Sequence, residues 1–139
     1  MTTFTKASVT LAAAQNMTLA TVAHATEIGV CISVAVVDDS GIIKAFARMD
    51  GAPLVSVEVA KKKALTAVGF GLASGQPWVD MATSDPLLDR GLTSLPDFTY
   101  LPGGHPLVAE GQICGAVGVS GAHYSQDDVC AKAGLATLD

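Results

Sequence analysis

Aromatic, charged and cysteine residues are scarce in this sequence of 139 residues. Aromatic residues make up 5% of the chain and charged residues 15%, and 13 acidic residues outnumber 8 basic ones, for a net charge of −5. Nucleic acids and anionic membranes attract basic surfaces, so this balance argues against either partner. No apolar run approaches the roughly 18 residues that a membrane-spanning helix needs. We therefore expect a protein that binds neither nucleic acid nor membrane.

The few cysteines and histidines exclude further classes of protein. Cys31, Cys114 and Cys130 are odd in number, have apolar neighbours and lack metal-ligand spacing, which predicts reduced, buried thiols in a reducing compartment. The histidines show no zinc-binding pattern. Polar residues interrupt the alanine-rich N-terminal stretch, so we expect a helix there rather than a signal peptide. These features favour a cytoplasmic protein without a metal site built from side chains.

Apolar residues, by contrast, are abundant. They make up 50% of the chain, and the mean hydropathy is +0.44. A chain of this length is most simply one domain, residues 1–139. Because so apolar a chain has more apolar surface than one small core can bury, we expect a homo-oligomer.

The residue patterns predict helices and strands in the order α-β-β-α-loop-β-β-α. The expected helices span residues 5–28, 56–70, 77–81 and 125–138, and the expected strands span residues 31–38, 42–49, 106–110 and 112–120. Residues 83–104 are rich in turns, and a loop of that length is often functional. Two hairpins with helices between them indicate an antiparallel sheet, in an α/β fold of the α+β kind, and not a Rossmann fold.

Three local patterns predict how these elements pack. In the first helix, Val9, Ala13, Met17, Ala20 and His24 are expected to share one face. In the last strand, the alternate positions Cys114, Ala116, Gly118 and Ser120 form a face of small residues, to which a helix can pack closely. The basic run Lys61–Lys63, with Glu58 four residues before Lys62, indicates a solvated helix face.

Two short motifs carry the candidate site residues. In "GGHP", Gly103 and Gly104 allow a tight turn. His105 is then either the solvated tip of that turn or part of a ligand site. In the second case the glycine amides approach a ligand closely, and the imidazole binds iron or carries a proton. In "RMDGA", Arg48 and Asp50 have one residue between them, so on a strand they point to the same side. They form either a structural ion pair or an anion-binding site in which Asp50 orients Arg48.

The sequence resembles the GlcG/HbpS family, also called the PduO C-terminal-like or DUF336 family. The resemblance rests on "SVAVVDDSG", "RMDGA", "KKALTA" and "GGHPLVAEGQICGAVGVSGA", and covers almost the whole chain. It implies a profilin-like fold with an antiparallel sheet of about five strands flanked by helices, assembled into dimers up to octamers. It also implies a small-molecule pocket near the "GG" loop, the "RMD" turn and the first helix, at a subunit interface. Family members usually have an aliphatic residue at the position of His105, so this histidine is a departure from the pattern.

Two functions compete at this point, and the residues leave open whether the protein is an enzyme. The resemblance implies binding of haem or a related tetrapyrrole, with His24 or His105 as the iron ligand, although few aromatic residues are present to stack on a macrocycle. The alternative is a cofactor-independent isomerase, hydratase or lyase that acts on a carboxylate- or carbonyl-bearing metabolite of a catabolic pathway. There Arg48 would hold the anion, the amides of Gly103 and Gly104 would stabilise negative charge, and His105 would move the proton. Asp50 would position Arg48 or the imidazole. An accessory protein that binds a metabolite or a partner enzyme without catalysis is a third hypothesis.

Overall fold

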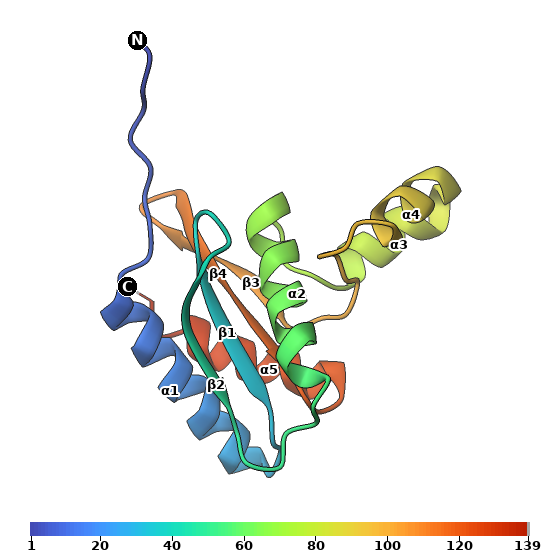
Figure 1. Ribbon diagram of the computed structural model, residues 1–139. Coiled ribbons are helices and arrows are strands. Elements are labelled where there is room, and N and C mark those ends of the chain that lie inside the picture. Colours follow the sequence, from blue (N-terminus) through green and yellow to red (C-terminus); the bar gives the residue numbers. More distant parts are fainter. Residues whose placement is uncertain (139) are drawn as a thin grey trace.

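The computed structural model describes residues 1–138, which form one antiparallel sheet between two layers of helices (Figure 1). The helices and strands follow in the order α1 (Leu11–Ile28), β1 (Ser33–Asp38), β2 (Ile43–Arg48), α2 (Ser56–Phe70), α3 (Gln76–Ser84), α4 (Pro86–Thr93), β3 (Gly104–Ala109), β4 (Gln112–Ser120) and α5 (Tyr124–Leu135).

The sheet has four strands in the order β2-β1-β4-β3, one fewer than the five or so that the resemblance implied. Both hairpins predicted from the sequence are present, and β4 pairs antiparallel with β1 and β3. The turn between β3 and β4 places Glu110 at φ 52° and Gly111 at φ 77°. Positive φ at both central residues is the two-residue hairpin turn whose twist matches that of the strands.

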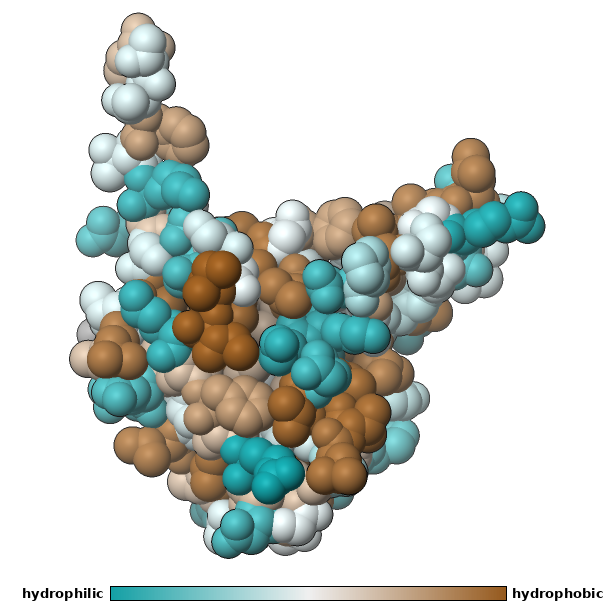
Figure 2. All heavy atoms as spheres, in the orientation of Figure 1, coloured by the Kyte–Doolittle hydropathy of each residue, from teal (hydrophilic) through white to brown (hydrophobic). Residues whose placement is uncertain are grey.

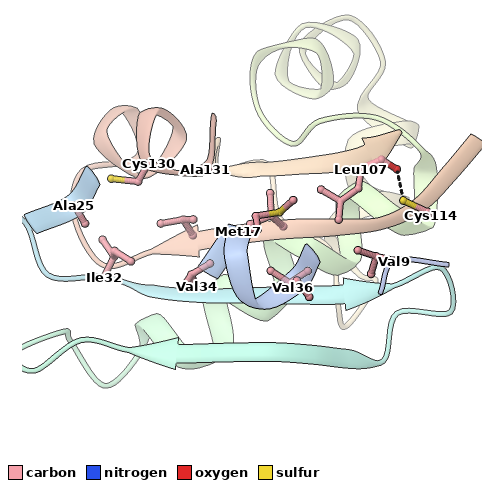
Figure 3. Packing of buried hydrophobic residues seen from close by; sticks show 13 residues of the cluster. Val9, Met17, Ala25, Ile32, Val34, Val36, Leu107, Cys114, Cys130 and Ala131 are labelled. Atoms are coloured by element: carbon pink, nitrogen blue, oxygen red, sulfur yellow. Dashed lines mark hydrogen bonds between the residues drawn. The ribbon is translucent and has the colours of Figure 1, made fainter. Parts of the chain in front are cut away.

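Small residues on β4 allow α2 to pack directly on one face of the sheet, as predicted. Any side chain at Gly118 would collide with the carbonyl oxygen of Ala60 in α2. The opposite face carries the main core, where Val117 and Val119 of β4 meet Met17 of α1 and Cys130 of α5 (Figure 3). The sheet is therefore covered by α2 on one side and by α1 and α5 on the other.

The first helix begins later than the sequence suggested and buries a face that only partly coincides with the predicted one. Thr10 caps it, accepting a hydrogen bond from the amide of Ala13 at 3.1 Å, and residues 1–10 precede it in extended form. Its fully buried positions are Ala14, Met17, Thr18, Thr21 and Ala25. The predicted stripe is therefore confirmed only in part. Val9 and Met17 lie in the core, whereas Ala13, Ala20 and His24 are only partly buried, because the alanines and threonines beside the stripe take the remaining core positions.

The turn-rich region contains a helix that the sequence did not predict. Pro86 was read as a loop residue, but Asp85 accepts hydrogen bonds from the amides of Leu87 and Leu88, and Pro86 occupies the first turn of α4, where it needs no donor. Helices α3 and α4 project together from the body of the molecule (Figure 1). Four aromatic rings pack edge to face at the base of this projection: Phe70, Trp78, Phe98 and Tyr100.

The cysteines are free thiols, as expected, but only two of them are buried. Cys114 and Cys130 lie in the core, whereas Cys31, which precedes β1, is exposed. The prediction that all three are buried was thus wrong, because apolar neighbours in the sequence do not by themselves place Cys31 in the core: the adjacent Ile32 is buried and Cys31 is not. Within residues 1–138, no helix combines the length and apolar character needed to cross a membrane.

Candidate functional site

His105 lies at the start of β3 and is hydrogen-bonded to α5. Its Nε2 atom is 2.6 Å from Oδ1 of Asp128, and Nζ of Lys132, one turn further along α5, is 3.0 Å from the other oxygen. Burial disfavours the charged carboxylate, but the hydrogen bonds from His105 and Lys132 outweigh it and hold the pKa of Asp128 below its ordinary value. The imidazole is only 13% exposed. His105 is therefore not a solvated turn tip but a link between strand and helix.

Gly103 and Gly104 do approach another group closely, and that group is helix α2 of the same chain. A side chain at Gly104 would collide with the carbonyl of Lys63. The amide of Gly104 donates to Oγ of Ser74 at 2.9 Å, and the carbonyl of Gly103 accepts from the amide of Val119 at 3.0 Å. The Gly104 amide thus already has a partner within the chain.

Lys63 is buried in the protein interior, contrary to the prediction that it lies on a solvated helix face. The basic run was interpreted as a solvated face, yet Lys63 is 1% exposed, and its Nζ lies 2.9 Å from Oδ2 of Asp127 and 2.8 Å from the carbonyl of Val119. Burial lowers the pKa of Lys63, while the charge of Asp127 acts in the opposite direction. Helical spacing from Val59 through Lys63 to Thr66 gave a signal for this burial, but the charge of three consecutive lysines obscured it.

His24 has a buried ring nitrogen without a hydrogen-bond partner among the described residues. Its side chain, on α1, is 29% exposed, and Nδ1 lies 3.5 Å from Oε2 of Glu27. Its Nε2 is buried and has no hydrogen-bond partner among the described residues. His123, in contrast, caps α5 through Nδ1, which accepts from the amide of Ser125 at 3.2 Å. Each of the three histidines therefore has one ring nitrogen in contact with a neighbouring group, and among the described residues His24 differs in that its other nitrogen is buried without a partner.

Arg48 and Asp50 are both exposed, and no ion pair joins them in the part of the chain that the structure describes. Arg48 lies opposite Ser33, whose hydroxyl is 2.8 Å from that of Ser56 in α2, so Arg48 is on the α2 face. His105 is bonded to α5 on the other face. The two residues also lie on opposite edge strands, roughly 14 Å apart at about 4.8 Å per strand. One chain does not bring Arg48 and His105 together around a small substrate.

The surface has three larger grooves, none of them at the predicted motifs. A groove of about 600 Å³ lies between the N-terminal segment and the end of α2, one of about 500 Å³ between α1 and β2, and one of about 420 Å³ beside the start of α1. Among residues 1–138, neither His24, Arg48 nor His105 lines any of these three. No group of three or more metal-ligating side chains occurs in the same residues.

These features define a small α+β protein with one antiparallel sheet between helical layers and a partly exposed histidine, His24, on α1. The chain belongs to the HbpS-like family, since the family model described as "Haem degrading protein HbpS-like" matches residues 9–136. The resemblance seen in the sequence motifs is thereby confirmed.

Three similar proteins place the chain within this family. An uncharacterized 15.0 kDa protein from the dhaT-dhaS intergenic region of Citrobacter freundii is 34% identical over 129 residues, which cover 93% of this chain and 91% of that protein. The crystal structure of the Klebsiella pneumoniae protein ORFY, of the DUF336 family, superposes with a TM-score of 0.91 at 31% identity, covering 99% of this chain and 94% of that one. A crystal structure of a PduOC–haem complex superposes with a TM-score of 0.87 at 28% identity, covering 95% and 96% of the two chains.

Proposed function

We propose that this protein binds haem or a related tetrapyrrole, with His24 as the iron ligand. The observation that carries the proposal is the unpartnered Nε2 of His24. Axial ligation by histidine requires a ring nitrogen free of other bonds. The existence of a haem complex of the similar PduOC protein, and the family's description, support the same ligand class.

The residues near His24 fit such a group in donor type and in polarity. The ring is partly exposed, so a rotation about its side-chain torsions can turn Nε2 outward. The exposed side chain of Ile28, one turn after His24 on α1, offers an apolar contact for a macrocycle in place of a stacking aromatic ring. When bound, the iron would supply redox chemistry, and the part of this chain is to hold and orient the group.

His105 fits this role less well, although the sequence left the two histidines equal. Its Nε2 is hydrogen-bonded to Asp128, and iron ligation through that nitrogen would break a contact that joins β3 to α5. We therefore assign His105 to the fold in a haem-binding protein.

A hemin titration followed by absorbance tests the proposal, with His24→Ala, His105→Ala and His123→Ala in parallel. We expect a saturable Soret shift in the wild type that is lost in His24→Ala and kept in the other two variants. Absorption that rises without saturation in the wild type would reject tetrapyrrole binding. A shift lost only in His105→Ala would move the iron ligand to the "GGHP" turn.

A second candidate function is cofactor-independent proton transfer on a small carboxylate or carbonyl compound. It is favoured by the contact of His105 with Asp128, because a carboxylate that orients an imidazole is a common arrangement for acid–base catalysis. Lys132 then replaces Arg48 as the nearest cation to the imidazole pair. Full turnover in His105→Gln on an identified substrate would refute this mechanism.

We further infer a homo-oligomer, between a dimer and an octamer, in the cytoplasm. Many large apolar side chains remain exposed on the single chain, among them Leu54, Val55 and Leu87. A second subunit would also supply the walls that a macrocycle needs, since His24 lines none of the three grooves described above in residues 1–138. Gene neighbours that encode a catabolic pathway would favour the metabolite-binding alternative.

A further inference from the structure

The N-terminal segment, residues 1–8, stands away from the body of its own chain (Figures 1 and 2). Its residues are nearly all exposed, and Phe4 keeps 79% of its surface in solvent. Only the base of the segment is held, where Ala7 packs against the core and Ser8 bonds Asp39. Nζ of Lys6 lies 2.8 Å from Oδ2 of Asp39, and the amide of Val9 donates to the carbonyl of Cys114 at 2.9 Å.

This segment is suited to an extended conformation but gains little from its own chain. Threonine and phenylalanine at positions 2–5 favour extended backbone, and neither glycine nor proline occurs in residues 1–8. Fixing each residue of such a segment costs conformational entropy, which contacts must offset. Beyond the base of the segment, one chain provides few contacts that could do so.

A groove of about 600 Å³ runs beside the segment at the same end of the molecule. Its far wall is formed by the end of α2, residues 68–71, and by Gln112 and Ile113 at the start of β4. The side chains of Phe70 and Ile113 are partly exposed there. Phe4 lines the near rim but remains mostly in solvent, so its ring leaves the groove open.

The ion pair between Lys6 and Asp39 explains why the segment does not fill this groove itself. It ties the chain to the turn between β1 and β2, and the residues before it run outward from that point (Figure 1). Phe4 can close over its own groove only if the neighbouring extended residues bend back. A second chain that approaches this end of the molecule meets an apolar wall and a projecting apolar ring side by side.

We propose that two copies of this chain exchange their N-terminal segments, each Phe4 ring packing into the groove between Phe70 and Ile113 of the second copy. A two-fold contact requires one surface to carry both complementary parts, and here segment and groove are adjacent. Specific interfaces bury about 800 Å² per partner, and eight extended residues with the groove that receives them cover an area of that order. The exchange deepens the self-association inferred above and is independent of the haem proposal.

Sedimentation equilibrium of the wild type, Phe4→Ser and the matched control Thr3→Ser tests the energetic part. Because each dimer would bury two Phe4 rings, we expect Phe4→Ser to raise the dissociation constant of the contact by about 100-fold or more, and Thr3→Ser to change it less than about threefold. Phe4 is exposed within its own chain, so circular dichroism should show both variants folded. Unchanged self-association of Phe4→Ser would overturn the exchange while leaving oligomer formation and haem binding intact.

Photo-cross-linking tests the placement of the ring. A benzophenone amino acid at position 4, in a mixture of ¹⁴N- and ¹⁵N-labelled protein, should yield cross-links to residues 68–71 or 112–113 that join one chain of each isotope. Cross-links confined to chains of one isotope would show that the segment folds onto its own body and would overturn the proposal. A monomeric wild type at all concentrations would overturn both this exchange and the homo-oligomer.

Discussion

Replacing Lys63 with methionine should destabilise the fold by about 3–5 kcal/mol, the usual cost of leaving one partner of a buried ion pair uncompensated. Lys63 and Asp127 are almost fully buried, with side chains 1% and 3% exposed. Methionine fills similar space but donates to neither Asp127 nor the carbonyl of Val119. For a chain of this length the loss corresponds to a fall in Tm of roughly 10–20 °C.

The measurement is urea and thermal unfolding of the wild type, Lys63→Met, Asp127→Asn and the double variant, at one fixed protein concentration. Lys62→Met is the matched control, since Lys62 is the preceding residue on the same helix and is not buried; we expect a change within about 0.5 kcal/mol. The double variant should lose less than the sum of the two single losses, because it no longer buries an unpaired charge.

The reasoning would be refuted by strictly additive losses, or by a loss of less than about 1 kcal/mol in Lys63→Met. Either result would mean that the two side chains are solvated or unpaired in solution. In that case the pair of Lys63 and Asp127 would not help to fix the neighbouring "GG" turn, whose position would depend on Gly103, Gly104 and Ser74.

Three further predictions concern other parts of the molecule. The pKa of Asp128 is lowered in the fold, so its contribution to stability is present above the unfolded pKa of about 3.9. That contribution is lost as the pH falls through the folded pKa. Urea midpoints measured between pH 6 and 2 should therefore fall less steeply in Asp128→Asn than in the wild type. Gly118→Ala should cost about 1–3 kcal/mol or more, because the added carbon collides with the backbone of α2; thermal unfolding measures this, and an unchanged Tm would contradict the close packing. A thiol reagent should modify Cys31 rapidly and Cys130 only on unfolding, since burial raises the pKa of Cys130 to about 11; a second fast thiol would show that the core opens.

Much of the fold could be predicted from local patterns. The two hairpins and helix α2, residues 56–70, were predicted because alternating apolar residues, turn residues and helical spacing all agree there. Helix α4 was missed because Asp85 and Pro86 serve equally well in a turn and at a helix start. The face of α1 was misassigned because its buried residues are mostly alanine and threonine, which carry little hydrophobic signal.

The site was less predictable, since its contacts join residues far apart in the sequence. The sequence identified His105, but nothing local could name Asp128 as its partner, 23 positions later and on another element. The spatial separation of Arg48 from His105 depends on strand order and on which face each residue occupies, and neither follows from spacing along the chain. His24 was identified on a helix stripe, but its unpartnered nitrogen is visible only when the neighbours are in place.

Asp127 and Asp128 are neighbours in the sequence but bind elements in different layers. Asp127 pairs with Lys63 of α2, near the end of β4, and Asp128 bonds His105 of β3. Successive residues of a helix point about 100° apart, so this division of partners depends on the count of residues between β4 and α5. One inserted or deleted residue in that connection would rotate both carboxylates off their partners at once. This short stretch should therefore accept changes of side chain far more readily than changes of length.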